Sequence, residues 1–326
     1  MPIKTMSYNK LQDPKNSIPQ IWHSKRYYSL DAYFKNAFGQ KLKKIAIDAG
    51  FTCPNRDGSL DTRGCIFCSE GGSGEFAVPF SSIEAAGSYI AYFQSYTGTY
   101  APVERLERIY RQALADCSVL GISIATRPDC LPEDVLVLLR KLKADYPHKF
   151  IWIELGLQTI HDQTALYIRR GYSLDCFTRA VDALHSLRIP VIVHVILGLP
   201  GENERMMLET VEHLNTLPVF GIKLQLLHVL SGTDLAVDYK NGVFSVLTME
   251  EYLQILIKCI EHLSPNTVIH RVTGDGPKNL LIAPYWSANK QKVLNALHHR
   301  MKLQNSYQGK YWKGSISYAA GTSDTL

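Results

Sequence analysis

The chain has 326 residues, of which 46% are hydrophobic and 20% are charged, and its formal net charge at pH 7 is +5. These proportions are typical of a folded globular protein and exclude an intrinsically disordered chain. No apolar run is long enough to span a bilayer, and the first residues lack the apolar core of a signal peptide. We therefore expect a cytoplasmic protein with no membrane partner, in which the seven cysteines indicate metal binding or isolated thiols and not disulfides.

The charge is distributed unevenly along the chain. Residues 1–45 carry nine Lys or Arg and two Asp or Glu, and residues 286–326 carry six and one, so the part between them has a net charge of −7. Two basic ends around an acidic body favour a polyanionic partner such as a nucleic acid. The alternative is that these lysines form ordinary solvated surfaces.

Residues 1–40 are predicted to form a basic N-terminal arm of irregular structure. Aromatic side chains stand among its cations, at Trp22, Tyr27, Tyr28, Tyr33 and Phe34. Rings among cations suit stacking on nucleic-acid bases. The same rings could instead pack the arm onto the rest of the protein, and both interpretations stay open.

The most informative segment is a loop that follows a short strand expected at residues 44–48. It contains Cys53, Cys65 and Cys68, with eleven residues between the first two cysteines and two between the last two. A structural zinc ion takes four closed ligands, and a [4Fe–4S] cluster normally takes four thiolates. Three thiolates would leave one iron of such a cluster open. The alternatives are a zinc site completed by a distant residue and chance thiols in a loop.

The surroundings of these cysteines favour a cofactor site. Phe67 lies between the paired cysteines, where an aromatic ring can shield a cluster from solvent. A glycine-rich turn that includes Gly72 and Ser73 follows at once, and its backbone amides could approach a small polar ligand closely.

Strands and helices are predicted to alternate along the rest of the chain. Strands are expected at 89–94, 119–125, 150–157, 190–196, 221–227 and 267–272, and helices at 81–88, 102–115, 132–144, 161–169, 174–187, 202–217, 249–263 and 288–303. About six β/α units in series predict a parallel sheet, most simply an open or partial TIM-type barrel at residues 41–275. Residues 276–326 would form a basic, helical C-terminal extension. Ligands should lie at the C-terminal ends of the strands.

Polar side chains mark several of these strand ends. Glu154 and Gln158 alternate on one face of an apolar strand, where an inward carboxylate needs either a function or a partner such as an interior arginine. His194 lies on a wholly apolar strand, as a ligand contact or as a hydrogen-bonded core residue. Weaker candidates for substrate contact are His228, His270, Arg271, Lys290 and Arg300, for which a salt-bridged rim is the alternative.

Three cysteines that end in Cys-x-aromatic-Cys after a first strand resemble the signature of radical S-adenosylmethionine (SAM) enzymes. The long spacer and the Gly-Leu-Pro-Gly turn at 198–201 are similar to the YtqA/YhcC subgroup, relatives of the radical SAM domain of the Elongator catalytic subunit. This resemblance covers roughly residues 20–300. It implies a [4Fe–4S] cluster on the three cysteines, with SAM bound to the open iron. By the same resemblance Glu154, Gln158, Arg170 and His194 line the SAM site, with Arg170 on the methionine carboxylate.

The resemblance also implies a substrate. It predicts modification of the wobble uridine of tRNA, from a 5-carboxymethylaminomethyl toward a 5-aminomethyl group, with a reductant protein such as flavodoxin or ferredoxin as partner. A SAM methyltransferase would then complete the modification. The alternatives are a radical SAM enzyme that acts on a peptide or small metabolite, and a zinc-containing RNA-binding protein without catalysis. No acid, base or nucleophile is assigned.

Overall fold

The computed structural model describes residues 21–83, 87–274 and 276–314. Its centre is an eight-stranded sheet with the strand order β2-β1-β3-β4-β5-β6-β7-β9, in which every neighbouring pair is parallel. The strands are β1 (Lys43–Asp48), β2 (Val78–Pro79), β3 (Tyr89–Phe93), β4 (Val119–Thr126), β5 (Phe150–Gln158), β6 (Val191–Leu197), β7 (Gly221–Leu226) and β9 (Val268–Arg271). Because the order runs from one edge strand to another, the sheet is open. The predicted open TIM-type barrel is confirmed.

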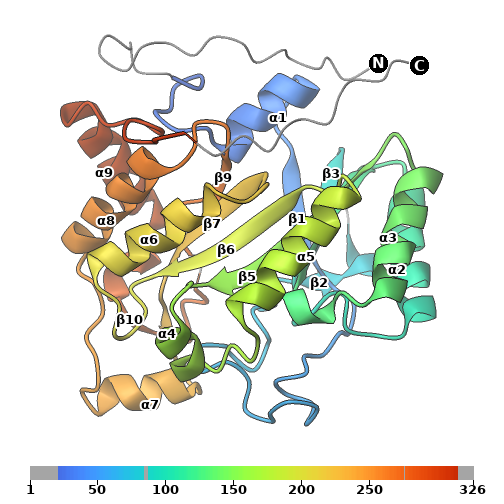
Figure 1. Ribbon diagram of the computed structural model, residues 1–326, viewed down its shortest axis with the longest axis horizontal. Helices are drawn as coiled ribbons and strands as arrows, with labels where there is room; N and C mark the ends of the chain where they lie inside the picture. The colour runs from blue at the N-terminus through green and yellow to red at the C-terminus, as the bar shows by residue number, and fades with distance from the viewer. Residues whose placement is uncertain (1–20, 84–86, 275, 315–326) are drawn as a thin grey trace.

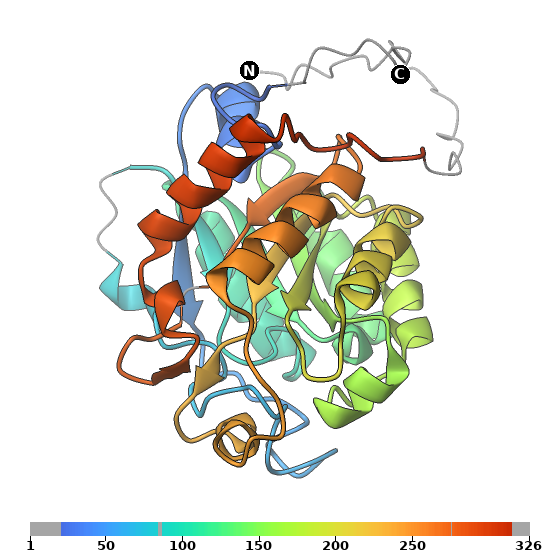
Figure 2. The same ribbon diagram turned by 90° about the vertical axis from the view of Figure 1, so that its left-hand side faces the viewer.

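Helices cover the outer face of this sheet, as Figures 1 and 2 show. They are α2 (Val103–Ala115), α3 (Glu133–Asp145), α4 (Asp162–Tyr167), α5 (Leu174–Ser186), α6 (Glu204–Leu214) and α8 (Met249–His262). Outward strand residues such as Ile153 and Val193 are buried against helix residues such as Leu139 and Val181. Within the described ranges, no helix has the length and apolar character needed to cross a membrane.

The segment after β7 and the C-terminal part of the chain add smaller elements. β8 (Val229–Leu230) pairs antiparallel with β10 (Leu281–Ala283), and α7 (Asp234–Lys240) lies between them in sequence. Single 3-10 turns occur at Phe80–Ser82, Pro128–Cys130 and Tyr285–Ala288, and α9 (Lys290–Leu303) packs against α8. The 3-10 turns, β8, β10 and α7 carry too few residues for a periodic signal and were not predicted, whereas α9 corresponds to the helix predicted at 288–303. Of the helix expected at 81–88, residues 84–86 lie outside the described residues.

Part of the N-terminal arm is helical, which corrects the prediction of an irregular arm. Helix α1 (Leu30–Phe38) begins after Ser29, whose Oγ accepts a hydrogen bond from the backbone amide of Ala32 at 3.3 Å. It ends at Gly39, which adopts the left-handed conformation with φ of 69°. A serine cap and a glycine stop are both visible in the sequence, so this helix was predictable.

Helix α1 closes the N-terminal end of the barrel, opposite the cysteine loop (Figure 1). Phe34 is 2% exposed and stacks on Trp152 of β5, with ring centroids 6.0 Å apart. Tyr33 meets Phe220 edge to face at 5.1 Å. Trp22 and Tyr27 of the arm are also buried. These rings therefore pack the arm onto the barrel and are not available for stacking on bases.

Removal of this aromatic contact should destabilise the protein. Phe34→Ala deletes a buried ring, so we expect the free energy of unfolding to fall by about 3–5 kcal/mol. Denaturant unfolding of the anaerobically purified protein measures this change. Leu166→Ala is the control, because Leu166 is 81% exposed and its loss should cost less than about 0.5 kcal/mol. Equal effects of the two substitutions would show that α1 is not part of the cooperative core.

Candidate functional site

A cavity of about 1820 Å³ lies inside the barrel and opens at the C-terminal ends of the strands. Inward residues of β1 and β3–β7 line it, together with the loop after β1 and the segment that leads into α9. Small-molecule pockets usually have about 300–1,000 Å³. The space is thus larger than one cofactor requires and leaves room for part of a second, larger ligand.

All three cysteines of the loop after β1 line this cavity. The Asn55 side-chain amide lies 3.5 Å from the Cys65 sulfur and donates to the backbone carbonyl of Arg169 at 2.8 Å, which ties the loop to the turn after α4. Arg56 donates to the carbonyls of Cys68 and Ser69, both at 2.7 Å. Neighbouring backbone therefore holds the loop, and the thiols face the cavity.

These thiols fit a cluster held by three thiolates. Burial, reinforced by Cys68, raises the pKa of Cys65 to about 12, so release of its proton requires a cation such as iron. Over the described ranges, no three His, Cys, Asp or Glu side chains gather closely enough to hold one metal ion. The cysteines are instead spread along one wall. A cluster accommodates such a spread, because each thiolate binds a different iron.

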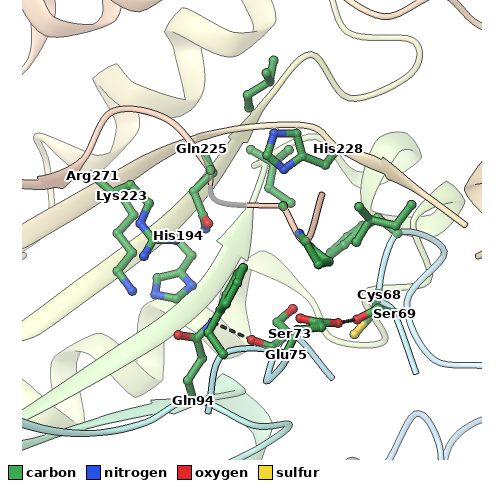
Figure 3. A pocket seen from close by; sticks show the side chains of 18 of the residues that line it. Cys68, Ser69, Ser73, Glu75, Gln94, His194, Lys223, Gln225, His228 and Arg271 are labelled. Atoms are coloured by element: carbon green, nitrogen blue, oxygen red, sulfur yellow. Dashed lines mark hydrogen bonds between the residues drawn. The ribbon is translucent and has the colours of Figure 1, made fainter. Parts of the chain in front are cut away.

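A second group of polar residues surrounds Glu154 deeper in the barrel. Its side chain has no exposed area, and its carboxylate has four partners. Oε1 accepts from Lys44 at 2.5 Å and from Ser123 at 2.6 Å, while Oε2 lies 2.7 Å from His194 Nε2 and forms an ion pair with Lys223. Figure 3 shows His194, Lys223 and Arg271 side by side. The alternative of an interior pairing for Glu154 is thus realised with lysines and not with an arginine.

The charged side chains around Glu154 shift one another's pKa values. Burial alone would raise the pKa of Glu154, but Lys223, Lys44 and His194 hold it well below the usual value. Burial lowers the pKa of Lys223 to about 7; Glu154 opposes this shift, and the nearby cations Lys44 and Arg271 add to it. Burial and nearby Lys223 lower the pKa of His194 to about 4, so this imidazole is neutral at pH 7.

The glycine-rich turn forms the wall beside the cysteines. A Cβ atom at Gly72 would lie 2.4 Å from the ring of Tyr96, so only glycine fits there. Gln94, directly after β3, donates to the Ser73 carbonyl at 2.6 Å, a bond drawn in Figure 3. The turn is therefore held close to the sheet. Of the residues predicted to bind the cofactor, the cavity is lined by Phe67, Gly72, Ser73, Glu154, Gln158 and His194.

Arg170 is not brought to the cavity. Its side chain is buried, and its guanidinium donates to the backbone carbonyls of Leu157 at 3.1 Å, Thr159 at 2.6 Å and Tyr172 at 2.9 Å. These bonds use Nε and Nη1 and fasten the end of β5, whereas Nη2 has no hydrogen-bonding partner among the described residues. A contact between Arg170 and SAM stays a prediction. Arg127 does line the cavity, 4.9 Å from the Tyr172 ring and paired with Asp129 at 2.6 Å.

Four of the five candidates for substrate contact line the cavity: His228, His270, Arg271 and Lys290. Arg300 does not, because it lies on the face of α9 that meets α8 and forms an ion pair with Glu250. Two further lining residues, Lys44 and Lys223, belong to no motif. The alternation that placed Glu154 inside its strand also applies to these lysines, and this signal could have found them.

Comparison with known proteins identifies the family. Residues 62–214 match the model of the radical SAM superfamily, and residues 219–303 match that of the radical SAM C-terminal domain. The protein YtqA of Bacillus subtilis (strain 168) is 42% identical over 91% of this chain and 96% of its own. The chain belongs to the radical SAM superfamily. The expected kinship with YtqA and YhcC is confirmed.

More distant relatives of this radical SAM chain include archaeal proteins. A tRNA uridine(34) acetyltransferase of Methanocaldococcus infernus is 26% identical over 55% of this chain, which spans about a third of that enzyme, 33%. The structure of Elp3 from the same organism, with an N-terminal deletion, matches with a TM-score of 0.58 and 17% identity, over 69% of this chain and 56% of that one. This second match shows the fold alone.

Membership of the radical SAM superfamily fixes the cofactors, which are a [4Fe–4S] cluster and SAM, and the chain is an enzyme. The zinc-containing RNA-binding alternative is set aside on this ground. The cluster ligands, the SAM contacts and the domain boundaries at residues 40 and 275 stay predictions. Among the lining residues, Gln158, Gly72 and Ser73 lie in the wall that the cysteines share.

Replacement of Cys53, Cys65 and Cys68 by Ala should abolish iron binding. Anaerobically reconstituted protein should contain about four irons per chain with brown iron–sulfur absorption, because the cluster has four irons. Cys117→Ala is the control, since Cys117 is exposed and does not line the cavity. Full iron content in the triple variant would contradict the ligand assignment.

Glu154→Gln should destabilise the protein in a pH-dependent way. The variant leaves Lys44 and Lys223 without their counter-charge, so the free energy of unfolding should fall by about 3–5 kcal/mol at pH 7. Because the folded-state pKa of Glu154 is lowered, this stabilisation is present above the unfolded value of about 4.3 and is lost as the pH falls through the folded value. Unfolding midpoints of wild type and variant should therefore converge on acidification.

The matched control is Glu107→Gln, whose ion pairs with Arg111 and Lys141 lie on the outer helices α2 and α3. It should change the midpoint little at any pH. If the difference in unfolding midpoint between Glu154→Gln and wild type stays constant from pH 7 to strongly acidic pH, the assignment of Glu154 as ionised is contradicted.

Proposed function

We propose that this radical SAM enzyme modifies the wobble uridine of tRNA, converting a 5-carboxymethylaminomethyl toward a 5-aminomethyl group. The observation that carries the proposal is the charge of the cavity. Eight Lys or Arg side chains line it, against two carboxylates, Glu75 and Glu154. The basic residues are Lys44, Arg56, Arg127, Lys223, Arg271, Lys278, Lys290 and Lys292. Such a lining favours an anionic ligand. Lys44, Lys290 and Lys292 come from the two basic ends of the chain, and the other five cations come from its acidic central part.

The position of the outer cations supports a nucleic acid over a small metabolite. Lys278 and Lys292 are exposed, and with Lys290 they lie on the segment that follows β9 and enters α9. Tyr285 of the same segment is 77% exposed and also lines the cavity, so its ring is accessible for stacking on a base. Cations beside an exposed ring suit a single-stranded loop such as the anticodon loop.

We therefore expect tRNA to bind other residues than those expected from the sequence. Trp22, Tyr27 and Phe34 of the N-terminal arm are buried, and Arg300 is paired with Glu250. The rim residues come from the start of the C-terminal extension. A relative named for its action on uridine 34 of tRNA gives independent support for the substrate.

Residues at different depths of the cavity would have different roles. When bound, the cluster and SAM would supply a 5′-deoxyadenosyl radical that takes a hydrogen atom from the carbon between the substrate amine and its carboxylate, with SAM as the two-electron oxidant. Addition of water to the resulting imine would release the two carboxymethyl carbons as glyoxylate and leave the 5-aminomethyl group. Cys53, Cys65 and Cys68 hold the cluster at one wall, and Gly72, Ser73 and Gln158 are positioned to hold SAM beside it. The rim binds phosphates, and a base turned out of the loop enters the cavity, which excludes water. Flavodoxin or ferredoxin as reductant, and a partner methyltransferase, are part of the proposal.

The first test is chemical. The reconstituted enzyme, with SAM and a reductant, should convert 5-carboxymethylaminomethyluridine in tRNA to 5-aminomethyluridine, as measured by mass spectrometry of nucleosides. Cleavage of SAM that responds to a peptide and not to tRNA would favour the peptide alternative.

The second test concerns the rim. Affinity for tRNA should fall steeply with salt, and replacement of Lys278, Lys290 and Lys292 together by Gln should reduce the slope by about two to three counterions. Filter binding over a salt series measures this slope. The control replaces three cations on outer helix α3, Arg140, Lys141 and Lys143, which do not line the cavity. Salt-insensitive binding, or equal slopes for both triple variants, would contradict the rim assignment.

A further inference from the structure

The floor of the cavity has more positive than negative charge. Lys44 of β1 and Lys223 of β7 share one carboxylate, Glu154, and the other acidic lining residue, Glu75, belongs to the glycine-rich turn. The side chains of Lys44 and Lys223 are only 15% and 6% exposed. An excess of buried positive charge is costly unless an anion compensates it.

Glu154 has no capacity left for these cations. Its two oxygens accept from four donors, which corresponds to the lone pairs that a carboxylate offers. Each lysine keeps one donor, because an ammonium has three N–H groups. Lys44 uses two on Glu154 and Ser123, and Lys223 uses two on Glu154 and the Tyr92 hydroxyl, 2.8 Å away. One N–H of each remains for a ligand.

The lysines are held in place without a ligand. The Lys44 ammonium lies 4.9 Å from the centre of the Tyr92 ring and 5.2 Å from that of Trp152, and Lys223 lies 4.4 Å from Tyr92. On the adjacent strands, His194 and Arg271 are the register partners of Lys223. Two ammonium groups on opposite strands are thus preorganised around one point, as an anion site requires.

His270 lies beside the two lysines and closes the floor. Both of its ring nitrogens are buried, and within the described part of the chain neither has a hydrogen-bonding partner. The ring meets Trp152 edge to face at 5.4 Å, and its Nε2 edge lies against Gly221. Burial and nearby Lys44 hold the pKa of His270 well below its usual value, so the ring is neutral and adds no charge to the floor.

We propose that this floor, formed by Lys44, Lys223 and Arg271, binds a carboxylate group of the substrate. The proposal rests on the proposed function, in which the carboxymethyl group of the modified uridine supplies the carboxylate. A backbone phosphate is joined to the chain on both sides and cannot reach so deep a point. A carboxylate at the tip of a slender substituent on an extruded base can reach it. The floor is then the residue set that distinguishes the substrate from a product that lacks the carboxylate.

The contact between the substrate carboxylate and a floor lysine can be tested by combining two substrates with two forms of the enzyme. The substrates are an anticodon stem-loop with 5-carboxymethylaminomethyluridine and the same stem-loop with its methyl ester, which is neutral at that position. Wild type should prefer the acid in kcat/KM by roughly tenfold or more, the effect of a charge-assisted hydrogen bond. Lys223→Met should reduce this preference to within about threefold. Lys44→Met is the second variant, should Lys223→Met fail to fold.

The matched control is Lys292→Met at the rim. It should lower kcat/KM for acid and ester alike and keep the preference. Equal kcat/KM of wild type for acid and ester would overturn the carboxylate site and leave the proposed function standing. Absence of turnover with both stem-loops and with whole tRNA would overturn both.

SAM also carries a carboxylate, and the same variants distinguish the two sources. A tenfold or larger rise in the SAM dissociation constant of Lys223→Met, with the acid preference kept, would assign the floor to the methionine carboxylate and overturn the proposal. An unchanged dissociation constant with a lost preference supports it.

Proton uptake gives a second readout. The pKa of Lys223 is about 7, so most of these amines are neutral at pH 8, and a bound carboxylate should raise this pKa and draw in a proton. Lys44, Tyr92, Glu154, His194, His270 and Arg271 are the charged or titratable groups that face it. Calorimetry in buffers of different ionisation enthalpy should show uptake of up to about one proton for the acid and none for the ester. Equal uptake with both would overturn the proposal.

Discussion

The carboxylate of Glu154 is the interaction on which the interior of this protein depends. One side chain on a central strand has partners on β1, β4, β6 and β7, and it has no exposed area. Two buried lysines are tolerable only because this carboxylate lies between them. The same saturation removes Glu154 from direct contact with a further anion, so it organises the site by holding the lysines and His194 in place.

The barrel is layered along its axis, and the layers follow from this constraint. Below the polar group, Phe34 of α1 and Trp152 form an apolar plug. Above it, the C-terminal ends of the parallel strands carry the cysteine loop and the glycine-rich turn, where ligands of such folds bind. The Trp152 ring stacks on Phe34 and also lies 5.2 Å from the Lys44 ammonium. The apolar layer therefore shields the charges from water at the closed end and leaves them open toward the cavity.

The order of strands and helices, the cysteine loop and the inward positions of Glu154, Gln158 and His194 could be predicted, because they depend on local periodicity and spacing. The partners of these side chains could not. Arg170 matches a family arginine in sequence, yet three backbone carbonyls at the end of β5 occupy it. Which acceptor a guanidinium finds is decided by the packing of α4 and β5, and no local pattern records it. The two lysines were visible as inward residues, but only the curvature of the whole sheet places them around one carboxylate.

The net charge of a chain segment likewise does not predict the charge of the ligand that the segment binds. The central part of the chain is acidic, which by itself would repel a polyanion. Five of its cations line the cavity together with three from the basic ends, so that the cavity is basic while the central part as a whole is not. The rim cations of the C-terminal extension and the floor lysines of the barrel then form two anion sites at different depths. The rim is suited to the phosphates that all tRNAs share, and the floor to one group that only a particular base carries. Affinity for the nucleic acid and selection of the modified base can thus be adjusted separately in one cavity.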